Sequence, residues 1–295
     1  MNESAFIWIA TFWMAVVGGS VGSFINVVVY RLPAGINLSY PSSHCPNCRH
    51  PIRWHDNVPV FGWLKLRGRC RDCRTRIPLR YPAVEASVAA LFVLIAFAEG
   101  ATLGANLPTR PLTVADGLIF PDLTVWELAG IMGWHLLLLC TLLCASLIRY
   151  DGHEVPLRMF GPALVVAALG SMIWPQLHPL PAVMLATGPT PGLIDALAGL
   201  AAGTVLGLAA WKLLEPSQRP DLAWAAALVG TMLGWQALLV IWGATVVLVV
   251  ASKVVGYLRA PWRRVPPVAW LGLCSAAWIF QWRWLAEVVF GSVAG

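Results

Sequence analysis

The chain has 295 residues, of which 58% are hydrophobic and only 12% are charged. Soluble domains carry about 25% charged residues, so this composition excludes an ordinary soluble domain and indicates an integral membrane protein. The formal net charge of +6 fits the Lys and Arg enrichment of short cytoplasmic loops better than a nucleic-acid site. We expect no nucleic-acid partner.

The first apolar run covers residues 5–30, more than the roughly 20 apolar residues that a transmembrane helix needs. Glu3 precedes this run, and no Lys or Arg does, so the pattern is not that of a secretory signal. We therefore expect residues 1–30 to form a first transmembrane helix that is retained.

Two C-x-x-C pairs lie in the polar segment 31–81, formed by Cys45 with Cys48 and by Cys70 with Cys73. Paired thiolates at this spacing close a tetrahedral zinc site. Four thiolates leave no coordination position open for a catalytic water. The spacing therefore predicts a structural zinc ion, with two disulfides or four unused thiols as the alternatives.

The charge of this segment helps to decide between a zinc ion and disulfides. Arg31 to Arg80 contains ten of the twenty Lys and Arg residues of the chain, against two acidic residues, Asp56 and Asp72. Short loops with this bias stay in the cytoplasm, where the reducing environment disfavours disulfides. We therefore predict a small cytoplasmic zinc-binding domain at 31–81. The other cysteines lie in apolar runs, where cysteine usually acts as a small hydrophobic residue, and are assigned no role: Cys140, Cys144 and Cys274.

A second helix and an extracytoplasmic loop are expected at 82–125, with the span at about 82–99. Residues 126–295 are expected to form a helical membrane domain. Its apolar stretch from Leu222 to about Val250 is too long for one ordinary span and is predicted to contain two. The remaining spans are expected at about 126–148, 157–175, 192–213 and 267–290. The sequence thus predicts an all-α polytopic membrane protein with about eight transmembrane helices.

The connections on the side of the cysteine segment are basic, which predicts that they are cytoplasmic and that both termini face away from the cytoplasm. The opposite loops are nearly uncharged or acidic. The basic residues in question are Arg149, Arg158, Lys212, Arg219, Lys253, Arg259, Arg263 and Arg264.

Several motifs follow one another in a recognisable order. They are GSVGSFINVVVYRLP (19–33), CPNC (45–48), RGRCRDC (67–73), IPLRYPAVE (77–85), LIDALAGLAAG (193–203) and VGTMLGWQALL (229–239). In these motifs the chain resembles the type IV prepilin peptidases, which are bifunctional leader peptidases and N-methyltransferases of bacteria. The resemblance implies a bacterial inner-membrane enzyme that removes basic leaders from type IV prepilins or pseudopilins. It also implies N-methylation of the new amine from S-adenosylmethionine.

The resemblance further implies a GxGD-type aspartic peptidase with two membrane-embedded aspartates. One carboxylate activates a water molecule while its protonated partner acts as the acid. The first family aspartate stands seven residues before a proline, a place held here by Arg149, and Asp151 follows two residues later. The region aligned with the second motif, PSQRPDLAWAAALVG, contains Asp221. The candidate catalytic residues are therefore Asp151 and Asp221.

Each candidate also has a structural explanation, because an acidic residue at a helix start serves as a cap. Asp195 matches a family position without a catalytic role, and we expect it to serve packing or the start of a helix. His153 and Glu154 are expected to belong to an exposed charged turn.

Two functions follow from these patterns. The first is a prepilin-peptidase-like enzyme that uses a shifted pair of aspartates. The second is a catalytically inactive homologue that binds pilin-like helices or proteins of the assembly machinery.

Overall fold

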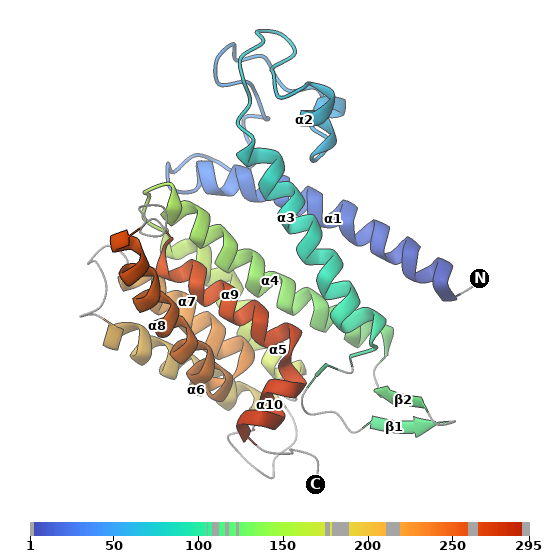
Figure 1. The fold of residues 1–295 in the computed structure, drawn as a ribbon, viewed down its shortest axis with the longest axis vertical. Helices are drawn as coiled ribbons and strands as arrows, with labels where there is room; N and C mark the ends of the chain where they lie inside the picture. The colour runs from blue at the N-terminus through green and yellow to red at the C-terminus, as the bar shows by residue number, and fades with distance from the viewer. Residues whose placement is uncertain are drawn as a thin grey trace. The chain divides into compact units, whose positions relative to one another are not determined.

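The computed structural model describes residues 3–104, 106–107, 112–115, 118–121, 124–174, 178, 189–210, 219–258 and 265–290. These residues are predominantly helical (Figure 1). The expected all-α class is confirmed, and the described residues add one short antiparallel hairpin, formed by β1 (Leu112–Ala115) and β2 (Leu118–Pro121). The chain divides into two compact units, Met1–Phe97 and Ala98–Gly295.

The first unit is built on two helices, α1 (Glu3–Arg31) and α3 (Arg80–Ile95), which pack side by side (Figure 1). Their backbones approach closely at Gly22, where an added Cβ would lie 2.7 Å from the Cα of Glu85. Small residues of this kind allow apolar helices to pack without a gap. The amide of Asn26 adds a hydrogen bond, donating to the carbonyl of Tyr81 at 3.2 Å.

The segment between these helices contains only short elements, η1 (Trp54–Asp56) and α2 (Phe61–Lys65). It has no apolar core of helices or sheets to stabilise it, and a domain this small usually needs a metal ion or disulfides. After α3 the chain continues through a π-helix, η2 (Ala96–Ala101).

The second unit is a bundle of helices. Its first long helix, α4, begins at a capping box in which Thr124 and Glu127 bond reciprocally through side chain and backbone. Gly234 has a φ of +86°, and it separates α7 from α8 as the sequence predicted for this stretch. The helices are α4 (Val125–Tyr150), η3 (Leu157–Met159), α5 (Phe160–Ile173), α6 (Pro189–Ala209), α7 (Arg219–Leu233), α8 (Trp235–Leu258), α9 (Pro267–Phe280) and α10 (Trp282–Phe290).

The closest helix pair in this bundle is α6 with α7. An added Cβ at Gly199 would lie 1.9 Å from the carbonyl oxygen of Gly230, and one at Gly203 would lie 2.3 Å from that of Ala226. The small residues of LIDALAGLAAG therefore form a contact face. This contact fixes the position of α7 and of the residues in its first turn.

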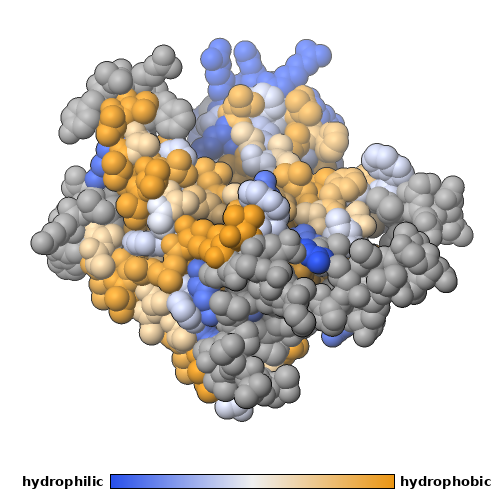
Figure 2. Space-filling view, turned by 60° about the horizontal axis from the view of Figure 1, so that its bottom comes forward, coloured by the Kyte–Doolittle hydropathy of each residue, from blue (hydrophilic) through white to orange (hydrophobic). Residues whose placement is uncertain are grey.

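Among the described residues, five helical segments are long and apolar enough to cross a membrane: Trp8–Arg31, Arg80–Ala101, Val125–Tyr150, Pro189–Ala209 and Trp235–Gly256. Three shorter apolar helices accompany them: Leu157–Ile173, Pro220–Leu233 and Pro267–Phe280. Hydrophobic residues cover much of the face shown in Figure 2, and side chains such as Val205 and Val247 are about two-thirds exposed, at 64% and 65%. Apolar surface of this extent marks a membrane protein.

One expected span differs from the structure. Residues 267–290 were predicted to form a single helix, but α9 ends at Phe280, and Gln281 separates it from α10. The interruption coincides with the polar residues Gln281 and Arg283, a break in the apolar run that the single-helix prediction overlooked. The basic residues Lys212, Arg259, Arg263 and Arg264 lie outside the described residues.

Candidate functional site

The two C-x-x-C pairs fold into hairpins with the same hydrogen bonding. The backbone N–H of Cys45 donates to the carbonyl of His50 at 3.0 Å, and that of Cys70 donates to the carbonyl of Thr75 at 2.9 Å. Each hairpin presents both sulfurs of its pair on one tight turn. The hairpins also share an antiparallel bridge and a residue of positive φ, namely His44–Pro51 with Arg49 and Arg69–Arg76 with Arg74.

The four sulfurs form a compact cluster with the dimensions of a zinc site. The Sγ atoms of Cys45 and Cys73 lie 3.7 Å apart and those of Cys48 and Cys70 lie 3.9 Å apart, and all four lie within 4.8 Å of one another. A zinc–sulfur bond of about 2.3 Å gives a tetrahedron with sulfur–sulfur edges of about 3.8 Å. A disulfide needs about 2.05 Å. The donor set therefore fits a tetrahedral metal ion, and the thiols are free.

The pKa values of the thiols also favour a bound metal ion. Hydrogen bonds from Thr75 and then Asn47 lower the pKa of the Cys73 thiol to about 5. The backbone hydrogen bond of His50 lowers the pKa of Cys48, but burial and the neighbouring sulfurs outweigh it and raise that pKa to about 12. Adjacent thiolates repel one another, so the four thiols cannot all ionise without a cation between them. A divalent metal ion would offset this repulsion.

An ion pair to a buried carboxylate supports the second hairpin. Arg71 donates from Nε and Nη2 to the two carboxylate oxygens of Asp56, at 2.6 and 2.5 Å. Asp56 is buried in η1, and the bidentate guanidinium lowers the pKa of its carboxyl below the ordinary range. The pair ties η1 to the turn that carries Cys70 and Cys73.

A second carboxylate fixes the start of α2. The backbone N–H of Val60 donates to Oε2 of Glu85 on α3 at 2.6 Å. Val60 has a φ of +62°, a left-handed conformation that a β-branched residue rarely adopts. The hydrogen bond to Glu85 stabilises this strained turn.

In the second unit, Asp221 lies in the first turn of α7 and is only 4% exposed. The Nη2 of Arg149, in the last turn of α4, donates to its carboxylate in an ion pair. The backbone of Val155 bonds to the same carboxylate. The end of α4 and the start of α7 thus meet, although 72 residues separate Arg149 from Asp221.

The other candidate, Asp151, is the C-cap residue of α4 and is exposed. It ends this helix rather than beginning the next one, so the alternative in which it caps the following helix is wrong. His153 and Glu154 are exposed in the same turn. Asp221 lies two residues inside its helix rather than at the cap.

Within its described residues, the second unit also contains two buried acid–histidine pairs. Of these four residues, the sequence analysis identified only Asp195. His135 and Glu99 are 0% exposed, with Nδ1 and Oε1 2.5 Å apart. Nδ1 of His178 and Oδ2 of Asp195 lie 3.7 Å apart, and the two residues are 1% and 2% exposed. An ionisable residue inside an apolar helix is the sequence signal that could have identified these pairs. Asp195 is thus a buried residue that lies beside a buried histidine.

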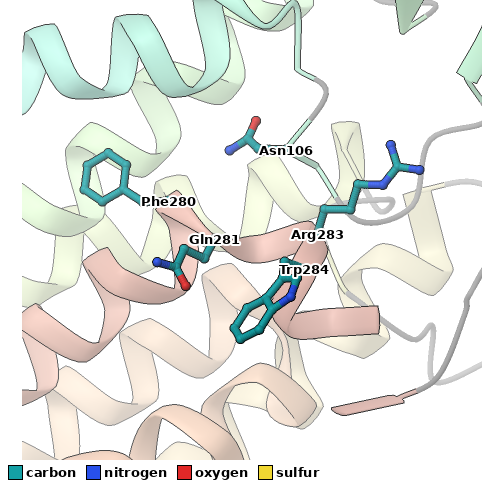
Figure 3. A pocket seen from close by; sticks show the side chains of 5 residues that line it. All are labelled: Asn106, Phe280, Gln281, Arg283 and Trp284. Atoms are coloured by element: carbon teal, nitrogen blue, oxygen red, sulfur yellow. The ribbon is translucent and has the colours of Figure 1, made fainter. Parts of the chain in front are cut away.

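A cavity of about 440 Å³ lies at the junction of α9 and α10 (Figure 3). Asn106, Phe280, Gln281, Arg283 and Trp284 line it. None of the predicted site residues belongs to it, so it plays no part in the site built on Asp221.

The sequence is similar to proteins of one family. Residues 16–98 match the family model described as Bacterial Peptidase A24 N-terminal domain. A prepilin leader peptidase/N-methyltransferase of Burkholderia pseudomallei is 34% identical over 251 residues, which cover 67% of this chain and 75% of that protein. Proteins of the same name from Klebsiella pneumoniae and Neisseria gonorrhoeae are 46% identical over 98 residues and 35% identical over 188 residues.

The high-identity matches are partial. The match to the Klebsiella protein covers 31% of this chain and 42% of the relative. The match to the Neisseria protein covers 54% of this chain and 62% of the relative. The chain thus spans less than two thirds of the length of these relatives. No solved structure matches the chain.

Proposed function

The chain belongs to the prepilin leader peptidase/N-methyltransferase family, and we propose that it is a membrane aspartic endopeptidase that cleaves basic leaders from type IV prepilins or pseudopilins. Burial of Asp221 against the end of α4 is the observation that carries this proposal. The contacts of Arg149 and Val155 with Asp221 support the proposal, because they join the end of α4 and the turn after it to the start of α7.

The proposed chemistry uses Asp221 as the general base. Its carboxylate takes a proton from a water molecule that attacks the scissile carbonyl, and the leaving amine receives a proton from an acid. Asp151, in the turn after α4, is the proposed acid. Arg149, at the place where the family has a carboxylate, forms an ion pair with Asp221.

The eight-span topology is part of the proposal. Five segments have the length and hydropathy of spans, and we assign the three shorter apolar helices to the membrane as well. This topology leaves the end of α4 and the start of α7 on the cytoplasmic side of a bacterial inner membrane, together with the cysteine segment. A basic prepilin leader on that side would then reach the site.

The cysteine segment is proposed to bind one structural zinc ion through Cys45, Cys48, Cys70 and Cys73. Four thiolates fill the coordination sphere, so the ion would hold the hairpins together and take no part in peptide hydrolysis. Relatives are named N-methyltransferases as well as leader peptidases, and we propose that this chain also methylates the new amine from S-adenosylmethionine.

The test is a reaction of a prepilin with the full chain in proteoliposomes, followed by mass spectrometry. The proposal predicts loss of the leader and, when S-adenosylmethionine is present, the added mass of one methyl group. Reporter fusions after residues 80 and 150 test the orientation. An intact prepilin, in an assay where a relative cleaves it, would contradict the proposal.

The ion pair also favours a second candidate, an inactive homologue that binds pilin-like helices. Arg149 stands where the family places a carboxylate, and it contacts Asp221 directly. The names of the relatives favour the first candidate, an active peptidase. Capture of an uncleaved prepilin by the chain would identify the inactive homologue.

A further inference from the structure

One side of α2 presents two large apolar side chains and a lysine to the surface. Phe61 is 71% exposed and Leu64 is 55% exposed, and Lys65 is exposed beside them. Residues three and four positions apart lie on the same side of a helix. These three residues therefore share one side of α2, which we call the α2 face.

The opposite side of α2 is packed against the rest of the cysteine segment. Gly62 is buried, and an added Cβ there would lie 2.2 Å from the carbonyl oxygen of Asp56. The indole N–H of Trp63 donates to the carbonyl of Ile77 at 3.0 Å. These contacts fix the rotation of the helix, so Phe61 and Leu64 cannot turn inward.

Two contacts place the start of α2 against the helix pair α1–α3. An added Cβ at Gly19 would lie 3.3 Å from the Cβ of Pro59, and the N–H of Val60 donates to Glu85 at 2.6 Å. At about 1.5 Å per helical residue, Gly19 lies about 18 Å before the end of α1, and Glu85 lies about 8 Å after the start of α3. The start of α2 is therefore level with the helix pair rather than beyond its end.

This level corresponds to the headgroup layer of a membrane. Both helices belong to segments that are long and apolar enough to span one, Trp8–Arg31 and Arg80–Ala101. A bilayer has a hydrocarbon core of about 30 Å within a total thickness of about 40–45 Å, which leaves about 5–8 Å of headgroups on each side. If α3 begins at the membrane surface, Glu85 lies near the inner boundary of this layer. The α2 face then lies at the depth of the headgroups.

The charge of the cysteine segment fits an anionic surface. Its two acidic residues are both paired, Asp56 with Arg71 and Asp72 with Arg53. Anionic lipids attract basic segments next to a membrane helix, roughly fivefold for each Lys or Arg near the surface. Lys65 is exposed on the α2 face, and further exposed basic residues of the segment are Arg49, Arg53, Arg67, Arg69, Arg74 and Arg76.

We propose that the α2 face binds anionic phospholipid headgroups beside the helix pair. Phe61 and Leu64 enter the boundary between headgroups and acyl chains, and the ammonium group of Lys65 contacts lipid phosphate. The contact anchors the cysteine segment at the membrane surface. It requires that α1 and α3 span the membrane, and it is independent of peptidase activity.

A photoreactive side chain on the α2 face tests the contact. The variant Phe61→benzoylphenylalanine of the full chain is irradiated in vesicles of equal parts phosphatidylglycerol and phosphatidylcholine, and peptide mass spectrometry identifies the adducts. Phe12 is the positive control, because it is 62% exposed within the α1 span. Tyr40 is the negative control, because it is 78% exposed next to Pro41, whose carbonyl accepts from Arg31 at the end of α1. We expect lipid adducts at positions 61 and 12 and few or none at position 40.

A matched pair of charge reversals tests the choice of lipid. In the protein with the photoreactive group at position 61, phosphatidylglycerol adducts should outnumber phosphatidylcholine adducts. Lys65→Glu should lower this ratio about fivefold or more. Arg49→Glu makes the same change in charge on the first cysteine hairpin and should leave the ratio nearly unchanged. Zinc content and melting temperature serve as folding controls for both variants.

Several outcomes would overturn the inference. One is a level of lipid adducts at position 61 no higher than at position 40. A second is an equal yield of the two lipids, or the same ratio in Lys65→Glu as in the parent protein. Crosslinks from position 61 to a second copy of the chain, or to an added prepilin in place of lipid, would identify a protein contact instead. The experiment contains no cleavage step, so its result does not depend on the proposed peptidase activity.

Discussion

Arg149 at the end of α4 forms an ion pair with Asp221 in the first turn of α7. Both side chains are nearly buried, at 9% and 6% exposed. The pair joins two helices far apart in the sequence and controls the environment of the proposed base. A guanidinium against this carboxylate stabilises its charged form, but it cannot act as the acid of a carboxylate pair.

Arg149→Asp should therefore raise the rate of leader cleavage. The substitution places a second carboxylate against Asp221, and one of two adjacent carboxylates retains a proton. This buried carboxyl group can then take over the role of acid from the exposed Asp151. Because general acid catalysis contributes about 10²–10⁴-fold, we expect an increase of at least about tenfold in the initial cleavage rate. Arg158→Asp, an exposed change near the same turn, is the control. A rate that falls in a folded Arg149→Asp protein would contradict this prediction.

Removal of any one zinc-site thiol should remove the metal. We expect the purified chain to contain about one zinc ion, and Cys73→Ser to contain almost none, since a structural site needs its full ligand set. Metal content by mass spectrometry measures this. Cys144→Ser is the control, because Cys144 is buried in α4 and lies outside the cluster. Equal zinc in both variants would exclude the proposed site.

The ion pair between Asp56 and Arg71 should make the cysteine segment sensitive to acid. The pKa of Asp56 is lowered in the folded chain, whereas an unperturbed aspartate titrates at about 3.9. Its stabilisation is therefore complete above about pH 5 and is lost as the pH falls below 3.9 and through the folded pKa.

The measurement is the difference in melting temperature between wild type and Asp56→Asn at several pH values. We expect a constant difference from pH 7 to about 5 and a smaller one at lower pH. Asp72→Asn is the control, because Asp72 pairs with Arg53 at 3.6 Å on the surface and exposed pairs contribute little. A difference that grows on acidification would contradict the assignment.

The glycine contact between α6 and α7 should be intolerant of even one methyl group. In Gly199→Ala the new Cβ would meet the carbonyl oxygen of Gly230 at 1.9 Å, so the helices must separate, at a cost of about 1–3 kcal/mol. A methyl group added at Gly243 in α8 would meet no atom within 4 Å, and Gly243→Ala should gain up to about 1 kcal/mol from helix propensity. Melting temperatures of the two variants in detergent should shift in opposite directions. Equal shifts would mean that the α6–α7 contact does not limit stability.

Features encoded by short stretches of sequence could be predicted. Every expected span overlaps a helix, because long apolar runs must satisfy their backbone hydrogen bonds internally. The cysteine cluster followed from spacing, since a C-x-x-C turn is closed by local hydrogen bonds such as that from Cys45 to His50.

Features that depend on distant residues could not be predicted. The sequence placed Arg149 near Asp151, but the helix packing directs Arg149 to Asp221. The pairing of Glu99 with His135 depends on the π-helix that contains Glu99.

Leader cleavage by the Asp221→Asn variant tests the central claim, that Asp221 is the base of a prepilin peptidase. Wild type, Asp221→Asn and Asp151→Asn would be compared in proteoliposomes with one prepilin, with the loss of leader measured by mass. We predict cleavage by wild type and none by Asp221→Asn, with Asp151→Asn reduced by about 10²-fold or more if Asp151 is the acid. Cleavage by a folded Asp221→Asn protein at the wild-type rate would contradict the claim.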